Sequence, residues 1–441
     1  MPGIFEKGRK FHLFYNCSMP ALFAFANRAR QWYNTYNWVK WRLLRGQDKN
    51  MWKDRIRPGN PEKLGVTRAG RELNFAVAVQ DGKDCSLLLY RKGMDEPELE
   101  LGFTDDMRFG EICAMGLEGL PVQEYEYNYK IDRKVVQDPY AAFIRGREIW
   151  GKAVEEEKLR CQTRFESFSW AGDHPLALPV EQCVLYKTHV RGFTMDPSSG
   201  VRHPGTFAGI REKIPYLKKL GITHLLLMPV YEFAEIREEH AAKKHMPVRK
   251  GMGERINYWG YGKAYYFAPK ASYCATKEPD REFRDMVHAL HQAGIECIME
   301  MYFPENTPSL QVVRSLWMWK LFYHVDGFHL MGDGVHQKVL EQDPILYGTK
   351  KMFSEIAGNA DTENMLAEYN AGFKQDMRRF LKSDEGMISG AEFHVRRNTG
   401  SFGTINYMAN QDGFTLYDTV AYNYRHNEAN GEDNRDGSEF N

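Results

Sequence analysis

Residues 323–333 have the sequence Y-H-V-D-G-F-H-L-M-G-D, and this stretch decides the fold of the chain. Its central run, V-D-G-F-H-L-M, is short and mostly apolar, and it ends in a polar loop, which predicts a buried strand. The segment before it has apolar residues at helical spacing: Leu310, Val313, Leu316, Trp317 and Leu321. That spacing predicts an amphipathic helix leading into the strand.

The same alternation of strands and helices extends back to residue 181. Strands are expected at 184–194, 223–230 and 295–302, with amphipathic helices around 210–217 and 283–290. Strands that alternate with helices build parallel sheets, so residues 181–441 are predicted to form an α/β domain of the TIM-barrel type.

The part of the chain before the barrel has a different pattern. Short, partly alternating apolar runs separated by turn residues occupy 64–67, 73–79, 85–90 and 125–132, and they predict an all-β sandwich at 56–150. Residues 151–180 are interpreted as a linker. Residues 1–55 are aromatic and basic and are left unassigned.

Several motifs together resemble the alpha-amylase family (glycoside hydrolase family 13), in its debranching branch of isoamylases, glycogen-debranching enzymes and pullulanases. They are H-V-R-G-F-T at 189–194, G-T-F-x-G at 205–209, L-M-P-V-Y-E-F at 227–233, N-Y-W-G-Y at 257–261 and V-D-G-F-H-L-M at 325–331. L-G-V-T, N-F-A-V, Y-x-Y and D-P-Y-A within residues 57–145 similarly resemble a family 48 carbohydrate-binding module. The resemblance implies a barrel that lacks its eighth unit at Asn441, or a fragment of a longer protein.

The resemblance also implies that the catalytic residues are replaced. In the family the fourth strand ends in V-D-G-F-R-F-D, whose last Asp is the nucleophile and whose Arg holds it; here these positions are Met331 and His329. The general acid is expected after L-Y-G, where this chain has Thr349. Retaining hydrolysis needs two carboxyl groups about 5 Å apart, and neither side chain supplies one, so loss of glycosidase activity is predicted.

At two more positions the resemblance implies a histidine that is changed: Glu305 stands where the family has a sugar-contacting histidine, and Gln411 stands for the histidine of the seventh-strand pattern. Asp333 lies two positions beyond Met331 and would face the same way if the strand continued, so a relocated pair of Asp333 and Glu305 is the one rescue considered. The resemblance implies that Tyr258 and Trp259 form an aromatic platform for glucose and that Asp412 hydrogen-bonds the sugar; both aromatic side chains could equally be retained for packing.

Composition sets the class of partner. Lys+Arg and Asp+Glu number 59 each, so no positive field favours nucleic acid or an anionic membrane, and no apolar run is long enough to span a bilayer. The seven cysteines are scattered, which favours free thiols in a cytoplasmic protein over a secreted one. No metal-ligand spacing involves His189, His324 or His329, and no cofactor is expected.

The function predicted from the sequence is a non-catalytic one. The first choice is a degenerate member of the family that holds an alpha-glucan such as glycogen or starch, or that regulates an active glucan enzyme or assembles as a homo-oligomer. One alternative is an active glycoside hydrolase that cleaves alpha-1,6 branches with relocated carboxylates. The other is a pure scaffold, and buried Tyr258 and Trp259 side chains would favour it.

Overall fold

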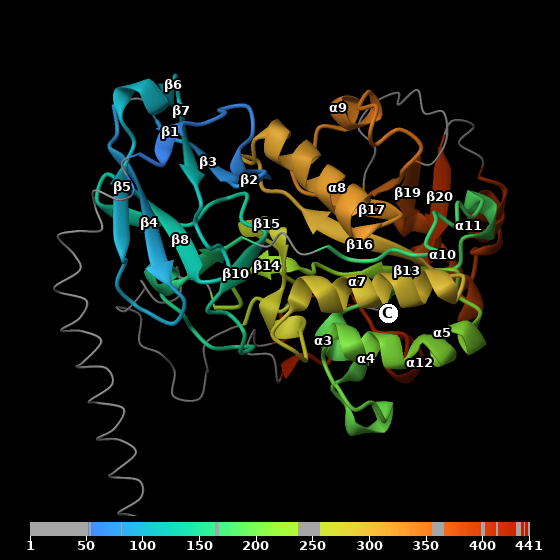
Figure 1. The fold of residues 1–441 in the computed structure, drawn as a ribbon. Helices are drawn as coiled ribbons and strands as arrows, with labels where there is room; N and C mark the ends of the chain where they lie inside the picture. Colours follow the sequence, from blue (N-terminus) through green and yellow to red (C-terminus); the bar gives the residue numbers. More distant parts are fainter. Residues whose placement is uncertain are drawn as a thin grey trace, which may run out of the picture.

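The computed structural model describes residues 52, 54–80, 82–163, 167–236, 256–354, 366–397, 402–411, 413–428, 434–435 and 437–439. They form a β-sandwich and, beside it, a curved parallel sheet covered by helices (Figure 1). This order confirms the predicted fold class. The prediction for residues 1–55 falls almost entirely outside the described residues.

The sandwich consists of two antiparallel sheets, as the short alternating runs predicted. Their strand orders are β1-β7-β3-β2, with β6 on β7, and β10-β11-β8-β4-β5, with β9 on β8. The strands are β1 (Ile56–Pro58), β2 (Gly65–Ala69), β3 (Glu72–Ala78), β4 (Cys85–Arg91), β5 (Leu99–Gly102), β6 (Arg108–Phe109), β7 (Ile112–Glu118), β8 (Tyr125–Ile131), β9 (Lys134–Val136), β10 (Phe143–Arg145) and β11 (Arg160–Gln162). Phe75, Leu87 and Tyr129 belong to the single core between the sheets.

The sandwich extends past its predicted end at residue 150. Strand β11 pairs with β10 and β8, and the Asn128 side chain donates a 2.7 Å hydrogen bond to the Leu159 carbonyl. The predicted linker 151–180 therefore begins with sandwich residues. A strand of three residues is too short to show the alternation from which strands are predicted.

Seven parallel strands form the second sheet, in the order β12-β13-β16-β17-β18-β19-β20. Consecutive parallel neighbours are the arrangement of a TIM barrel, here with seven strands in the described part of the chain. The strands are β12 (Leu185–Thr188), β13 (His224–Leu227), β16 (Glu296–Tyr302), β17 (Gly327–Met331), β18 (Lys350–Phe353), β19 (Leu366–Asn370) and β20 (Gly403–Asn406). The first strand is shorter than the predicted 184–194, because the chain turns at His189 into a helix.

Helices cover the outer face of this sheet (Figure 1). The helices of this part of the chain are α3 (Val190–Thr194), α4 (Phe207–Glu212), α5 (Ile214–Leu220), α7 (Pro279–Gln292), α8 (Ser309–Tyr323), α9 (Gln337–Glu341), α10 (Ala371–Leu381), α11 (Ile388–Arg396) and α12 (Asp418–Ala421). None of the helices within the described ranges is long and apolar enough to cross a bilayer.

Helix α8 confirms the predicted helix but corrects its buried face. Val313 and Leu316 are buried as predicted, whereas Leu310 and Leu321 are exposed. Trp319 is fully buried, and its indole N–H donates a 2.8 Å hydrogen bond to the Tyr266 carbonyl of the hairpin that the helix covers. The error arose because the helix is apolar on most of its surface, so spacing alone does not fix the buried stripe.

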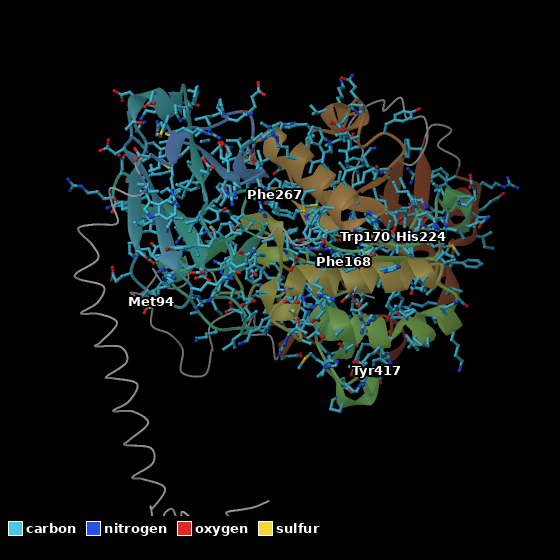
Figure 2. All side chains as sticks on the ribbon, viewed as in Figure 1. Met94, Phe168, Trp170, His224, Phe267 and Tyr417 are labelled. Carbon is cyan, nitrogen blue, oxygen red and sulfur yellow. The ribbon has the colours of Figure 1, made fainter. Side chains whose placement is uncertain are left out.

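A hairpin of β14 (Tyr231–Phe233) and β15 (Ala264–Pro269) follows β13 and joins the barrel to the sandwich. Ala268 of β15 belongs to the sandwich core, and the ring of Phe267 packs 4.9 Å from Tyr140. Figure 2 shows Phe267 at this border. The two parts therefore share a packed interface.

The inner face of the parallel sheet has an apolar middle between two polar levels. Leu226, Ile298, Met352 and Ala367 form the middle level. At the amino ends of the strands, Lys350 contacts both Glu296 and His224, and all three are buried. Alternate residues of each strand point to the inner face. At the carboxyl ends of the strands these inward-pointing residues are polar, and they form part of the candidate site.

Candidate functional site

The carboxyl ends of the parallel strands form the mouth of the barrel, where enzymes with this fold keep their reacting groups. Met331 is the last residue of β17, level with Tyr302 at the end of β16. It is half-buried, and its carbonyl accepts a 2.9 Å hydrogen bond from the Phe303 amide. A thioether at this position supplies neither a nucleophilic carboxylate nor a proton.

The structure does not bring Thr349 to this mouth. Thr349 directly precedes β18, and since Lys350 pairs with Gly327, it lies at the amino end of the sheet. The prediction that Thr349 occupies the general-acid position was therefore wrong. The carboxyl end of β18 instead leads to Ser354, and the next residue in the sequence is Glu355, outside the described residues.

Counting strand length would have found this position in the sequence. A buried strand that starts after the turn Y-G-T needs four or five residues to cross the sheet, which places its carboxyl end near Ser354. The L-Y-G motif lies before the strand, so the residue that follows it is at the amino end and not at the carboxyl end.

The two members of the relocated carboxylate pair, Asp333 and Glu305, both lie beyond the ends of their strands. β17 ends at Met331, and Gly332 adopts a left-handed φ of +92° that turns the chain before Asp333. A β-carbon at Gly332 would lie 2.3 Å from the Phe303 carbonyl oxygen, so the turn is tightly packed. Asp333 and Glu305 both lie in exposed turns. The strand does not continue to Asp333, so the condition under which Asp333 would face the same way as Met331 is not met.

A cluster of ion pairs and hydrogen bonds lies inside the barrel, near the carboxyl ends of the strands. Glu300 of β16 is fully buried; one of its carboxylate oxygens accepts from the Lys187 ammonium at 2.5 Å and lies 2.8 Å from His329 Nδ1. The other oxygen accepts a 2.6 Å hydrogen bond from the Tyr261 hydroxyl. Three donors therefore satisfy a single buried carboxylate.

These contacts fix the protonation states. Burial raises the pKa of Glu300, but the His329 hydrogen bond and the Lys187 charge outweigh it and hold the pKa at about 2. Burial lowers the pKa of His329 despite Glu300, so the imidazole is neutral near pH 7. Its Nδ1–H then donates to Glu300, and Nε2 accepts from the Ser354 hydroxyl at 3.2 Å. A carboxylate held in this way is a poor proton donor.

Gln411 joins this cluster from the segment after β20. Its side-chain oxygen accepts from Lys187 at 2.5 Å, and its amide donates to the Tyr261 hydroxyl at 3.0 Å. The predicted position of Gln411 at the mouth fits this placement. Asp412, the predicted sugar-binding acid, lies outside the described residues.

An aromatic platform lies beside the mouth, next to the end of β12. The side chains of Tyr258 and Trp259 are 36% and 39% exposed, and their rings meet edge to face at 5.1 Å. The ring of His189 stacks under Tyr258 at 4.1 Å and 16°. A β-carbon at Gly192 would lie 2.5 Å from the Tyr258 hydroxyl, so any larger residue there would displace the Tyr258 side chain.

His189 holds the platform by hydrogen bonds as well. The Gly192 amide donates to Nδ1 at 3.0 Å, so the proton lies on Nε2, which donates to the Tyr258 carbonyl at 2.8 Å. Burial, with the charges of Arg191 and Lys270, lowers the pKa of His189 to about 4, although the bond to Tyr258 raises it. A neutral imidazole thus fixes the backbone of the platform over a wide pH range.

The structure adds one aromatic residue that the sequence reasoning missed. Trp150, just after the sandwich strand β10, contacts the rings of His189 and Tyr258 edge to face at 5.9 and 5.8 Å. Nothing in the spacing of a lone tryptophan in a loop indicated this contact. Among the described residues, no group of His, Cys, Asp and Glu is arranged to hold a metal ion.

Known proteins with similar sequences are debranching enzymes. The chain is 28% identical to isoamylase 3 from Oryza sativa subsp. japonica, over 86% of this chain and 61% of the relative. It is 27% identical to the glycogen debranching enzyme of Dickeya chrysanthemi, over 87% of this chain and 71% of the relative. The chain spans 61–64% of the length of the four plant isoamylases that it matches. No family model matches the chain.

Solved structures with the same fold include pullulanases. The enzyme from Paenibacillus barengoltzii, solved with maltohexaose and alpha-cyclodextrin, superposes with a TM-score of 0.61 at 18% identity, over 82% of this chain and 68% of that chain. The enzyme from Bacillus acidopullulyticus gives a TM-score of 0.63 at 21% identity, over 82% and 53% of the two chains. These likenesses confirm the sandwich followed by a barrel-like domain.

Proposed function

We propose, from the similarity of most of this chain to the debranching branch of the alpha-amylase family, that the protein holds an alpha-glucan chain without cleaving it. The exposure of Tyr258 and Trp259 beside the barrel mouth carries this proposal. Flat aromatic rings cover the apolar faces of pyranose sugars. The rings of Tyr258 and Trp259 rest on neighbouring side chains but are not buried in the core, so they are accessible to a sugar. The pullulanase structure solved with maltohexaose supports the choice of ligand class.

The absence of cleavage is proposed from the groups at the mouth. Met331 stands at the carboxyl end of β17, where a retaining enzyme needs a nucleophilic carboxylate. Glu300, the nearest buried carboxylate along the neighbouring strand, is bound by Lys187 and Tyr261 and is not free to attack a sugar. The mouth is suited to contact a neutral polymer but not to hydrolyse it.

Isothermal titration with maltoheptaose and with glycogen, combined with an assay for released reducing ends, tests the proposal. We expect binding without release. Tyr258→Ala should weaken binding about tenfold, since one ring stacked on a sugar is worth about 1–2 kcal/mol. Tyr347→Ala is the matched control, because Tyr347 is an exposed tyrosine that precedes β18 at the opposite end of the sheet. Equal losses in both variants would contradict the platform.

A second candidate function is hydrolysis, favoured by one observation. The carboxyl end of β18 leads to Ser354 and then, in the sequence, to Glu355, which is where barrel enzymes place catalytic acids. Release of reducing ends that disappears in Glu355→Gln and persists in Asp333→Asn would replace the first proposal with an active hydrolase. If the protein neither binds glucan nor releases reducing ends, the remaining interpretation is a scaffold. Its partner would be an active glucan enzyme or a second copy of this chain.

A further inference from the structure

Trp150 belongs to the sandwich by sequence but packs on the barrel. It lies five residues beyond the end of β10, which pairs with β11 in the second sheet of the sandwich. Its indole nevertheless joins the core between the parallel sheet and its helices. The segment that follows the sandwich strand therefore contacts the barrel at the aromatic platform.

The indole of Trp150 contacts both layers of the platform. It stacks on Tyr273 at 5.6 Å and 21°, and it meets the edges of Tyr258 and His189. Tyr273 in turn lies with its hydroxyl 2.9 Å from His189 Nε2. Trp150 thus touches the exposed ring and the two side chains that support it.

Charged groups hold Trp150 in this orientation. The amide of Gly151 donates a 3.2 Å hydrogen bond to Glu235, which also pairs with the buried Lys270 ammonium at 2.7 Å. The Arg191 guanidinium lies 5.3 Å from the centre of the indole ring and the Lys270 ammonium 5.8 Å from it, within reach of cation–π attraction. The indole is therefore restrained through its backbone and through its ring.

We propose that Trp150 is a positioning residue for the glucan platform, and that the sandwich contributes to glucan binding through this side chain rather than through a sugar site of its own. This inference rests on the proposed function. A ring that contacts a platform edge to face limits the tilt of Tyr258 and so lowers the ordering required when a sugar stacks on it. Binding of a glucan then depends on the junction between the two parts of the molecule.

The test uses the full chain and maltoheptaose as the probe, with affinity measured by isothermal titration. Trp150→Leu should weaken binding about tenfold, equivalent to about 1.4 kcal/mol. Trp150→Phe keeps a flat ring and should restore affinity to within about threefold of the wild type. Trp170→Leu is the matched control: Trp170 is a half-buried tryptophan stacked on a histidine, His324, at 3.8 Å, and it lies beside α7 (Figure 2).

The outcomes separate the inference from the proposed function. Weaker binding in Trp150→Leu, rescue in Trp150→Phe and unchanged affinity in Trp170→Leu would support a positioning role, since a general loss of packing would not distinguish the two tryptophans. Wild-type affinity in Trp150→Leu would overturn the inference and leave the proposed function standing. A wild-type protein that does not bind maltoheptaose would overturn both.

Discussion

The substitution His291→Gln should reduce stability in a way that depends on pH. His291 lies on α7 between two carboxylates, with Nδ1 2.8 Å from Asp173 and Nε2 2.8 Å from Asp326. Both ring nitrogens must carry protons to donate to both acids, so the folded state favours the imidazolium. Burial lowers the pKa of His291, but the hydrogen bonds and charges of Asp326 and Asp173 outweigh it and raise the pKa to about 9.

The magnitude follows from the difference between the folded and ordinary pKa values. A rise from 6.5 to about 9 is about 2.5 pH units, equivalent to about 3 kcal/mol at 1.36 kcal/mol per unit. Because the folded pKa is raised, this stabilisation is fully present below pH 6.5 and is lost as the pH rises through 9. The pKa of Asp173 is lowered, since His324 and His291 outweigh its burial, so its own contribution is lost in acid instead.

Urea unfolding of the wild type and His291→Gln at pH 6, 7.5 and 9.5 measures this effect. We expect the wild type to exceed the variant by about 3 kcal/mol at pH 6, with a difference that shrinks steadily toward pH 9.5. His288→Gln, one turn earlier on the same helix, is the control for removing a histidine from α7. A difference between the wild type and His291→Gln that stays constant from pH 6 to 9.5 would refute the reasoning.

Two further substitutions test the mouth of the barrel by urea unfolding. Glu300→Gln leaves Lys187 without its buried partner and should lower the free energy of unfolding by about 3 kcal/mol at pH 7. This loss should shrink as the pH falls from 4.5 toward 2. The control Glu100→Gln, in an exposed pair, should lower it by less than about 1 kcal/mol. Gly332→Ala should lower the free energy of unfolding more than Gly348→Ala does. Both glycines have a left-handed φ, but only a β-carbon at position 332 would collide with backbone atoms. Equal losses of stability in the two variants would contradict the tight turn.

The sequence predicted the order of elements well because hydrophobic period and turn residues are local signals. The strand at 327–331 and the helix before it were found from spacing alone, and His324, with its left-handed φ of +55°, ends the helix where the pattern breaks. The buried face of α8 was partly missed because which apolar side chains are covered depends on the neighbouring hairpin. Local pattern cannot supply that information.

The candidate site was harder to predict than the fold. Tyr258 and Trp259 were identified from a motif, and their exposure came only from the structure. Thr349 was misplaced because a motif match says nothing about which end of a strand a residue occupies. The contact of Trp150 with Tyr258 joins residues more than a hundred positions apart, from two different domains. Such contacts follow from tertiary packing, which no spacing in the sequence records.

The charge balance around Glu300 bears on the proposal that the protein holds a glucan without cleaving it. With Met331 in place, the one carboxylate at this level of the inner face that the structure describes, Glu300, is matched by Lys187. A carboxylate at position 331 would lie on the same face of β17 as His329, the residue that pairs with Glu300, and like charges in a partly buried site raise each other's pKa. The Glu300 carboxylate is thus satisfied by its described neighbours, while the rings of Tyr258 and Trp259 remain exposed. A neutral polysaccharide can approach these rings without desolvating the Glu300 charge, as the proposed holding of a glucan requires.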